Sequence, residues 1–234
     1  MEIKQIYTGC LAQGSYYVKC SGEAVIIDPL REVQHYIDLA EKDNVKIKYI
    51  FETHFHADFV SGHVTLAEKT GAQIVYGPTA QTTFESIEAT DGQRFKVGKL
   101  EIEVLHTPGH TMESACFLVY DKHGKQHALF SGDTVFLGDV GRPDLAQKAE
   151  NMTQEDMALP FVRILGQLSP QVTDGDAKYI SGAKPGMIYN TVTSEMFDGK
   201  KGIKVIPCYY KKDYPEWSDR GDGPGAPVAI HAPG

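Results

Sequence analysis

Two histidines and an aspartate occupy alternate positions in Thr53-His54-Phe55-His56-Ala57-Asp58, directly after the apolar run Ile47-Lys48-Tyr49-Ile50-Phe51. Alternate residues of an extended segment share one face, so these three side chains can converge on one point. A single histidine at a strand end is usually a hydrogen-bonded structural residue, but two in register with an acid indicate a metal site. The feature therefore predicts a strand that ends in a metal-binding loop.

Two further apolar runs end in the same way. His106-Thr107-Pro108-Gly109-His110 follows the alternating segment 100–105, and Ser131-Gly132-Asp133 follows Ala128-Leu129-Phe130. Three strand-like runs thus each end in a metal-ligand type of residue beside small or turn-forming residues. This repetition favours one site built from several strand ends over a structural role for the whole set.

With these residues in this order, the chain resembles the metallo-β-lactamase superfamily over about residues 1–158. Within it, the chain is most similar to the persulfide dioxygenases, also called sulfur dioxygenases, in the bacterial branch that is fused to rhodanese domains. The segments that carry this resemblance are Thr53-His54-Phe55-His56-Ala57-Asp58-Phe59-Val60-Ser61-Gly62-His63 and Gly138-Asp139-Val140-Gly141-Arg142-Pro143-Asp144-Leu145. The resemblance implies an α/β protein with a metallo-β-lactamase-like α/β/β/α four-layer sandwich.

The resemblance also implies a ligand set. His54, His110 and Asp133 would hold one Fe(II) per chain, and His56 and Asp58 would lie beside the metal and orient its ligands and bound water. Two imidazoles and one carboxylate are the facial arrangement typical of non-haem Fe(II) oxygenases. Zinc tolerates the same ligands and is the alternative metal.

Position 59 decides how many metals to expect. In dinuclear relatives such as glyoxalase II, the Asp of the motif, the following His and a late histidine hold a second zinc, and Phe59 occupies the position of that following His here. Phenylalanine offers no lone pair, so we expect a mononuclear centre. Arg142 is the further candidate for a catalytic role, because a guanidinium can clamp a carboxylate of the site; an ordinary surface ion pair is the alternative for this residue.

The implied activity is oxidation of a low-molecular-weight thiol persulfide, such as glutathione or coenzyme A persulfide, by O2 to sulfite and thiol. Two alternatives stay open. One is a zinc-dependent thioester hydrolase like glyoxalase II, and the other is a metal-binding fold that is inactive because of its altered C-terminus.

Composition limits the partners. The net charge of -8 makes nucleic acid an unsuitable partner. No run approaches the roughly 18 apolar residues of a membrane helix, and the N-terminus reads as a strand and not as a signal peptide, so we expect a cytoplasmic protein without a membrane partner. The expected partners are the small-molecule persulfide and O2, and the oligomeric state is left open between a monomer and a homo-oligomer.

The cysteines form no Cys-x-x-Cys pair, which argues against a zinc ribbon.

Hydrophobic periodicity predicts mixed strands with helices outside them. Helices are expected over 33–43 and 59–69. Strands are expected near 2–7, 15–19, 24–28, 47–51, 73–76, 94–96, 99–106, 114–120 and 127–131.

The resemblance stops near residue 159, which divides the chain into a catalytic domain over 1–158 and a divergent C-terminal segment over 159–234. Residues 170–234 hold 8 Lys+Arg and 8 Asp+Glu, so the whole net charge of -8 comes from the part before them. Segments 181–190 and 204–210 are faintly similar to phage-encoded proteins of unknown function. The segment is either a genuine extension or a join between unrelated coding segments, and the abrupt stop favours the join. The sandwich is then incomplete at its C-terminal end and leaves a sheet edge uncovered.

Overall fold

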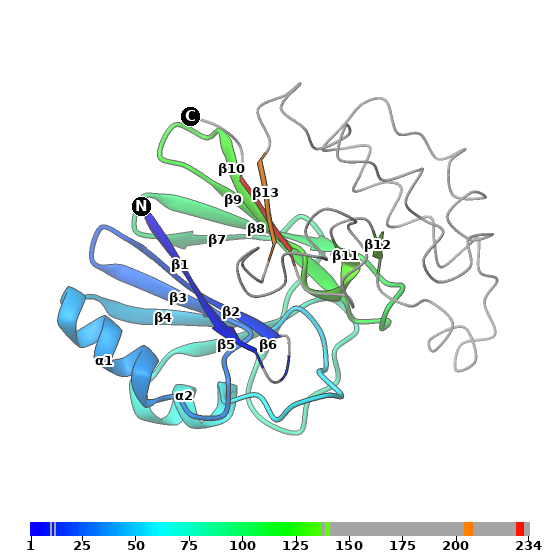
Figure 1. Cartoon of the computed structure of the whole chain (residues 1–234), viewed down its shortest axis with the longest axis horizontal. Coiled ribbons are helices and arrows are strands. Elements are labelled where there is room, and N and C mark those ends of the chain that lie inside the picture. The colour runs from blue at the N-terminus through cyan, green and yellow to red at the C-terminus, as the bar shows by residue number, and fades with distance from the viewer. Residues whose placement is uncertain (10, 12, 137–138, 141–203, 208–227, 232–234) are drawn as a thin grey trace.

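The computed structural model describes residues 1–9, 11, 13–136, 139–140, 204–207 and 228–231, which form two six-stranded sheets and one layer of helices (Figure 1). The first sheet has the order β1 (Glu2–Thr8), β2 (Gln13–Cys20), β3 (Glu23–Ile27), β4 (Lys46–Phe51), β5 (Gln73–Tyr76), β6 (Ile87–Glu88). The second has the order β13 (Lys204–Pro207), β14 (Val228–His231), β10 (Gln126–Phe130), β9 (Ala115–Tyr120), β8 (Leu100–His106), β7 (Arg94–Val97). A 3-10 turn at Gly132–Thr134 leads into the short pair β11 (Val135–Phe136) and β12 (Asp139–Val140).

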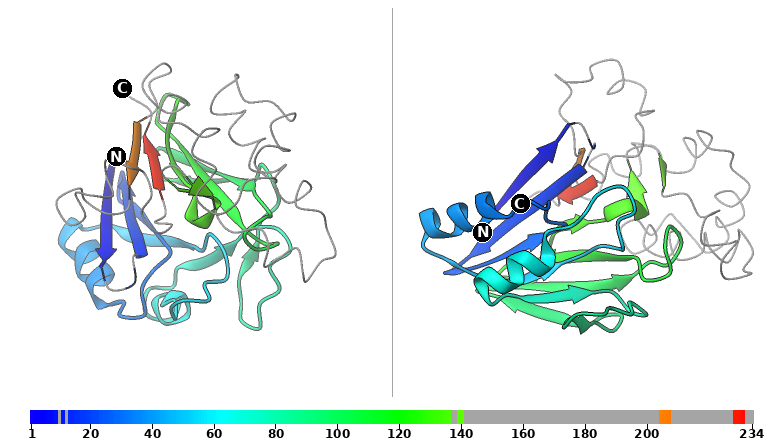
Figure 2. Two further views of the ribbon diagram at one scale, coloured as in Figure 1. Left: turned by 45° about the vertical axis from the view of Figure 1, so that its right-hand side comes forward. Right: turned by 90° about the horizontal axis from the view of Figure 1, so that it is seen from below.

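Helices α1 (Gln34–Asp43) and α2 (His63–Thr70) lie together on the outer face of the first sheet, as Figures 1 and 2 show. They connect the parallel strands β3, β4 and β5, which is the usual reason for a helix to cross over a sheet. Tyr17 of β2 and Ile26 of β3 face the helices, where they pack near Tyr36 and Leu66. The strands are therefore covered on both faces, and both helices end as expected, at Asn44 and Gly71 in the left-handed region.

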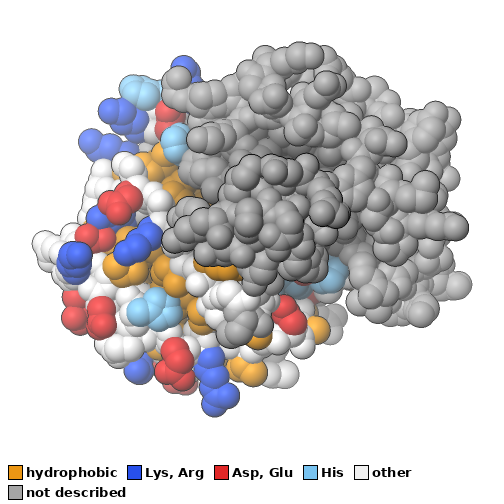
Figure 3. All heavy atoms as spheres, viewed as in Figure 1, with side chains coloured by type: hydrophobic (Ala, Val, Ile, Leu, Met, Phe, Trp, Pro, Cys, Tyr) orange, Lys and Arg blue, Asp and Glu red, His pale blue; other side chains and the backbone are white. Residues whose placement is uncertain are grey.

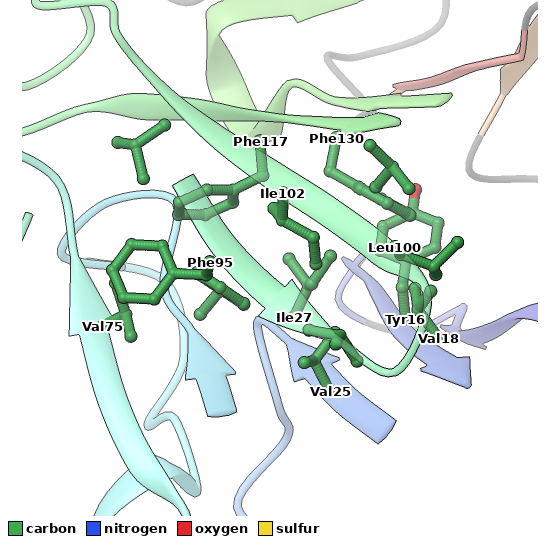
Figure 4. Close-up of a cluster of buried hydrophobic side chains, with 14 of the residues drawn as sticks. Tyr16, Val18, Val25, Ile27, Val75, Phe95, Leu100, Ile102, Phe117 and Phe130 are labelled. Atoms are coloured by element: carbon green, nitrogen blue, oxygen red, sulfur yellow. The ribbon is translucent and has the colours of Figure 1, made fainter. Parts of the chain in front are cut away.

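The main core lies between the two sheets (Figure 4). Residues alternate along each strand, so Tyr16 and Ile27 of the first sheet point inward to meet Ile102, Phe117 and Phe130 of the second sheet. The Tyr16 and Phe130 rings pack edge to face with their centroids 4.8 Å apart. This packing fixes the two sheets against each other and, with them, the loops at their shared rim.

Four strand ends meet at that rim. β3 and β4 are parallel, and β8 and β10 share one direction because each is antiparallel to β9. The loops that leave their C-terminal ends contain Asp28, His54, His110 and Asp133. The topology thus brings together residues that are far apart in the sequence.

The predicted strands and the first predicted helix are confirmed, but the second helix begins at His63 and not at residue 59. Ser61 instead forms a β-bridge with Leu30, and Gly62 packs so closely that a Cβ there would lie 2.2 Å from the Leu30 carbonyl oxygen. Residues 59–61 are therefore drawn across to the end of β3 before a helix can start.

The sheet edge that the sequence predicts to be uncovered is paired. β14 lies antiparallel to β10, with Leu129 opposite Ile230, and β13 lies antiparallel to β14. Both strands come from the segment that was expected to be foreign to the fold, and both contain β-branched apolar residues that suit a sheet. The prediction of an uncovered sheet edge is therefore wrong at β10, which pairs with β14.

The described residues supply three of the four expected layers, namely one helical layer and the two sheets. Within these residues, no helix is long and apolar enough to cross a membrane. On the face drawn in Figure 3, the described part carries Lys/Arg and Asp/Glu side chains intermixed, with apolar side chains between them. Arg142 and most of 159–234 lie outside the described residues.

Candidate metal centre

The rim of the sandwich brings His54, His110 and Asp133 together. One nitrogen or oxygen atom from each lies within 4.8 Å of the others. The Nε2 atoms of His54 and His110 are 3.8 and 3.5 Å from Oδ2 of Asp133, and the two rings meet nearly at right angles with centroids 5.0 Å apart. These are the three residues predicted as metal ligands, and their donor atoms face one common point.

A hydrogen-bonded chain orients His54. Asp28 accepts hydrogen bonds from the Thr53 backbone N–H and from Thr53 Oγ1, at 2.8 and 2.9 Å. A hydroxyl has only one hydrogen to give, so Thr53 Oγ1 must accept from Nδ1 of His54, 3.0 Å away. Nε2 of His54 then carries the free lone pair, on the side of the ring that faces Asp133.

Electrostatics favour a cation at this point. Burial holds the pKa of His54 well below its usual value, so this imidazole stays neutral and keeps a lone pair to donate. Burial also raises the pKa of Asp133 to about 6, because nothing in its surroundings compensates fully for its charge. Two imidazoles and one under-compensated carboxylate are a donor set that a divalent metal ion satisfies.

His56 lies next to this group but faces another way. Its ring centroid is 4.1 Å from that of His54, while its Nε2 is 3.1 Å from Oδ1 of Asp28 and 3.6 Å from Oε2 of Glu52. Burial alone would lower the pKa of His56, but Asp28 and Glu52 raise it to about 9. Asp28, Glu52 and His56 form a second group that could hold a cation. A protonated His56 between two buried carboxylates already offsets part of their charge, so we interpret these three as an ion-pair cluster.

The other predicted residues of the loop are more peripheral. Asp58 is exposed, and its charge contributes to the raised pKa of Asp133. Phe59 packs its ring on His56, with centroids 4.4 Å apart, so the position that carries the second-metal ligand in dinuclear relatives holds an aromatic contact here. Arg142, for which a catalytic role was predicted, lies outside the described residues.

Several residues that build the site carried no signal that singled them out in the sequence. Asp28 reads as part of an Asp-Pro turn, yet it is 2% exposed and has a positive φ of 49°. Such a conformation is strained for a residue other than glycine and clusters at functional sites. Glu52 and Glu113 are also buried acids. The one feature of the sequence that could have pointed to Asp28 and Glu52 is that each directly follows an apolar strand.

Comparison with known proteins agrees with this geometry. The family model described as the metallo-beta-lactamase superfamily matches residues 8–179, and the model described as Pam3 phage gp34-like protein matches residues 136–234. The predicted boundary at 158/159 lies inside the stretch that both models match.

Among curated proteins, a hydroxyacylglutathione hydrolase from Polaromonas sp. is 34% identical over 147 residues, which cover 60% of this chain and 54% of that protein. The chain spans about half the length of the curated relatives it matches.

Two solved structures share the fold. A metallo-beta-lactamase from Staphylococcus aureus subsp. aureus COL has a TM-score of 0.62 and 36% identity, covering 72% of this chain and 51% of that chain. ETHE1 from Myxococcus xanthus has a TM-score of 0.63 and 21% identity, covering 86% of this chain and 93% of that chain, and is similar in fold. With the sheets, the rim loops and the family match over most of its length, the chain belongs to the metallo-beta-lactamase superfamily.

Proposed function

We propose that the chain is a mononuclear non-haem iron persulfide dioxygenase. The observation that carries the proposal is the group of two imidazoles and one carboxylate, next to which Phe59 replaces a ligand for a second metal. His54, His110 and Asp133 would hold the iron, and Thr53 and Asp28 would keep His54 in the tautomer that leaves Nε2 free. Bound iron would supply open coordination positions and, unlike zinc, redox chemistry.

The proposed reaction consumes one persulfide R-S-SH, one O2 and one water and gives R-SH, sulfite and two protons. The terminal sulfur is oxidised and O2 is reduced, so no further reductant is needed. His56 would lie beside the metal group, with its ring held by Asp28 and Glu52.

A second candidate function is thioester hydrolysis. It is favoured by the curated relatives, several of which are named hydroxyacylglutathione hydrolases at about one third identity. Zinc at the same three residues would suit that chemistry, because zinc accepts imidazole and carboxylate ligands. The position of Phe59 favours the dioxygenase over this candidate.

Metal analysis and two activity assays separate the candidates. The protein is purified without added metal, its iron and zinc are quantified by mass spectrometry, and it is given glutathione persulfide in an oxygen electrode with sulfite detection. In parallel it is given S-lactoylglutathione. We expect about one iron per chain, O2 uptake with stoichiometric sulfite, and little hydrolysis. Two zincs per chain with thioester hydrolysis and no O2 uptake would replace the proposal by the second candidate.

A further inference from the structure

Glu52 is a fully buried carboxylate that the metal group does not use. It follows β4 directly and precedes His54 by two positions. Its Oε1 lies 2.5 Å from Ser61 Oγ and 3.3 Å from Nδ1 of His63, and its Oε2 lies 3.6 Å from Nε2 of His56. A buried charge costs several kcal/mol unless polar partners surround it, so these contacts call for an explanation.

The three partners lie on the two limbs of one loop. His56 is on the limb that leaves β4, whereas Ser61 and His63 are on the limb that returns to α2. Between them the chain runs out to solvent, and Val60 is 64% exposed. Glu52 is therefore a buried group that contacts both limbs of the metal loop, defined as residues 53–63 and including the first residue of α2.

Further contacts show that the returning limb is held in one place. The Gly62 backbone N–H donates to the Pro29 carbonyl at 3.0 Å, and Ser61 forms a β-bridge with Leu30. The His63 ring packs on Phe84, with centroids 4.9 Å apart. Because this limb is anchored to the end of β3, its contacts with Glu52 hold the Glu52 side chain in place, and Glu52 in turn holds the ring of His56.

We propose that Glu52 is a positioning residue of the metal centre, which ties the two limbs of the metal loop together and fixes the ring of His56 beside the metal group. This role deepens the proposed function and rests on it. Together with Asp28, Glu52 occupies the Nε2 side of the His56 ring and so fixes the orientation of that ring. His63 takes part through Glu52 and not as a metal ligand.

Glu52→Gln tests the role, because it keeps the shape of the side chain and removes its charge. Glu41→Gln is the matched control, since Glu41 is an exposed residue of α1. Iron affinity is measured on the holoenzyme by competition with a chelator, and the visible ligand-field spectrum is recorded after loading with Co(II). We expect Glu52→Gln to bind iron about 10- to 100-fold more weakly and to shift the Co(II) bands, while circular dichroism stays that of the wild type. The control should match the wild type in all three measurements.

Kinetics provide a further readout. A misplaced His56 should lower kcat for the persulfide with little change in KM, because the ligands that hold the metal remain. Ser61→Ala and His63→Gln remove the partners on the returning limb and should shift the Co(II) spectrum in the same direction as Glu52→Gln. These two variants keep the proposal testable if Glu52→Gln does not fold.

The outcomes are distinguishable from those of the proposed function. A wild-type protein without O2 uptake would refute the dioxygenase, yet the affinities and Co(II) spectra of the variants would still test Glu52. Unchanged metal affinity and an unchanged Co(II) spectrum in Glu52→Gln would overturn the positioning role, whatever reaction the protein catalyses. If Glu52→Gln does not fold, unchanged spectra in Ser61→Ala and His63→Gln would overturn it equally.

Discussion

The Oε1 atom of Glu113 accepts a hydrogen bond from the backbone N–H of Phe55 at 2.8 Å. This bond joins the loop that carries His110 to the loop that carries His54, although the bonded residues are 58 positions apart. A second link, between the buried hydroxyls of Thr107 and Thr134 at 2.9 Å, joins the His110 loop to the Asp133 turn. The three metal-group residues are therefore held by contacts between their own loops.

Glu113→Ala should weaken this arrangement. It leaves the Phe55 N–H without its acceptor in a partly buried setting, which should cost on the order of 1 kcal/mol of unfolding free energy. Metal content should fall with it, because the loops of His54 and His110 lose their link. Urea unfolding and metal analysis check both effects. Glu113→Gln keeps an acceptor oxygen and should lose less, and an Ala variant as stable as the wild type would contradict the role of this bond.

His110→Ala should remove metal binding and any activity that depends on it. The substitution deletes one of the two imidazoles from the metal group, and two remaining donors hold a divalent ion poorly. Metal content after extensive dialysis is the measurement. His123→Ala is the control, because His123 is exposed in the turn between β9 and β10. Equal metal loss in both variants would show that the ligand assignment is wrong.

Phe59→His should create a second metal site. The new imidazole and Asp58 are two donors, so protein reconstituted with excess zinc should hold a second ion weakly: the ratio should rise above one per chain and fall back on dialysis. Phe59→Ala removes the ring from His56 without adding a ligand and should stay near one. The measured ratio of metal to protein decides. Two tightly held zincs in the wild type would refute the mononuclear reading.

The metal group could be anticipated from the sequence, because strand periodicity and the histidine spacing are local features. The runs before His54, His110 and Asp133 end as expected, and the topology brings the three side chains together. The residues that support them could not be predicted in the same way. Glu113 acts across 58 positions, and the buried acid Asp28 looks like a turn residue.

The C-terminal strands were missed for a related reason. β13 and β14 are separated from β10 by a long stretch of sequence, so no local pattern pairs them. The start of α2 was placed too early because Phe59 continues a helical pattern, whereas the bridge from Ser61 to Leu30 is a tertiary contact. The join hypothesis and the boundary at 158/159 stay predictions.

Stability of the metal-free protein should fall as pH rises from about 6.5 to 9. The pKa of His56 is raised to about 9 in the folded state and returns to about 6.5 on unfolding, so the folded state binds more protons in this window. Unfolding free energy then decreases with pH, because the ion pairs of His56 with Asp28 and Glu52 are lost. The contribution is at most a few kcal/mol.

Urea unfolding of chelator-treated protein at pH 6 and pH 9 measures this slope. His56→Gln should be less stable than the wild type at pH 6 and should show a smaller loss between the two pH values. The same loss in the wild type and in His56→Gln would show that another group causes the pH dependence.

Deleting residues 204–234 should make the protein aggregate. β14 covers the edge of β10 over the pairs Ala128–His231, Leu129–Ile230 and Phe130–Ala229, and its loss would expose an apolar strand with unpaired backbone groups. Open edges of this kind recruit other chains. Light scattering after size-exclusion chromatography should show large assemblies for this deletion and a single species for a control that lacks only residues 232–234, which follow β14. A shortened chain that stays monodisperse and melts at the wild-type temperature would show that the N-terminal part closes its own sheet, and would return the C-terminal segment to the status of a separate appendage.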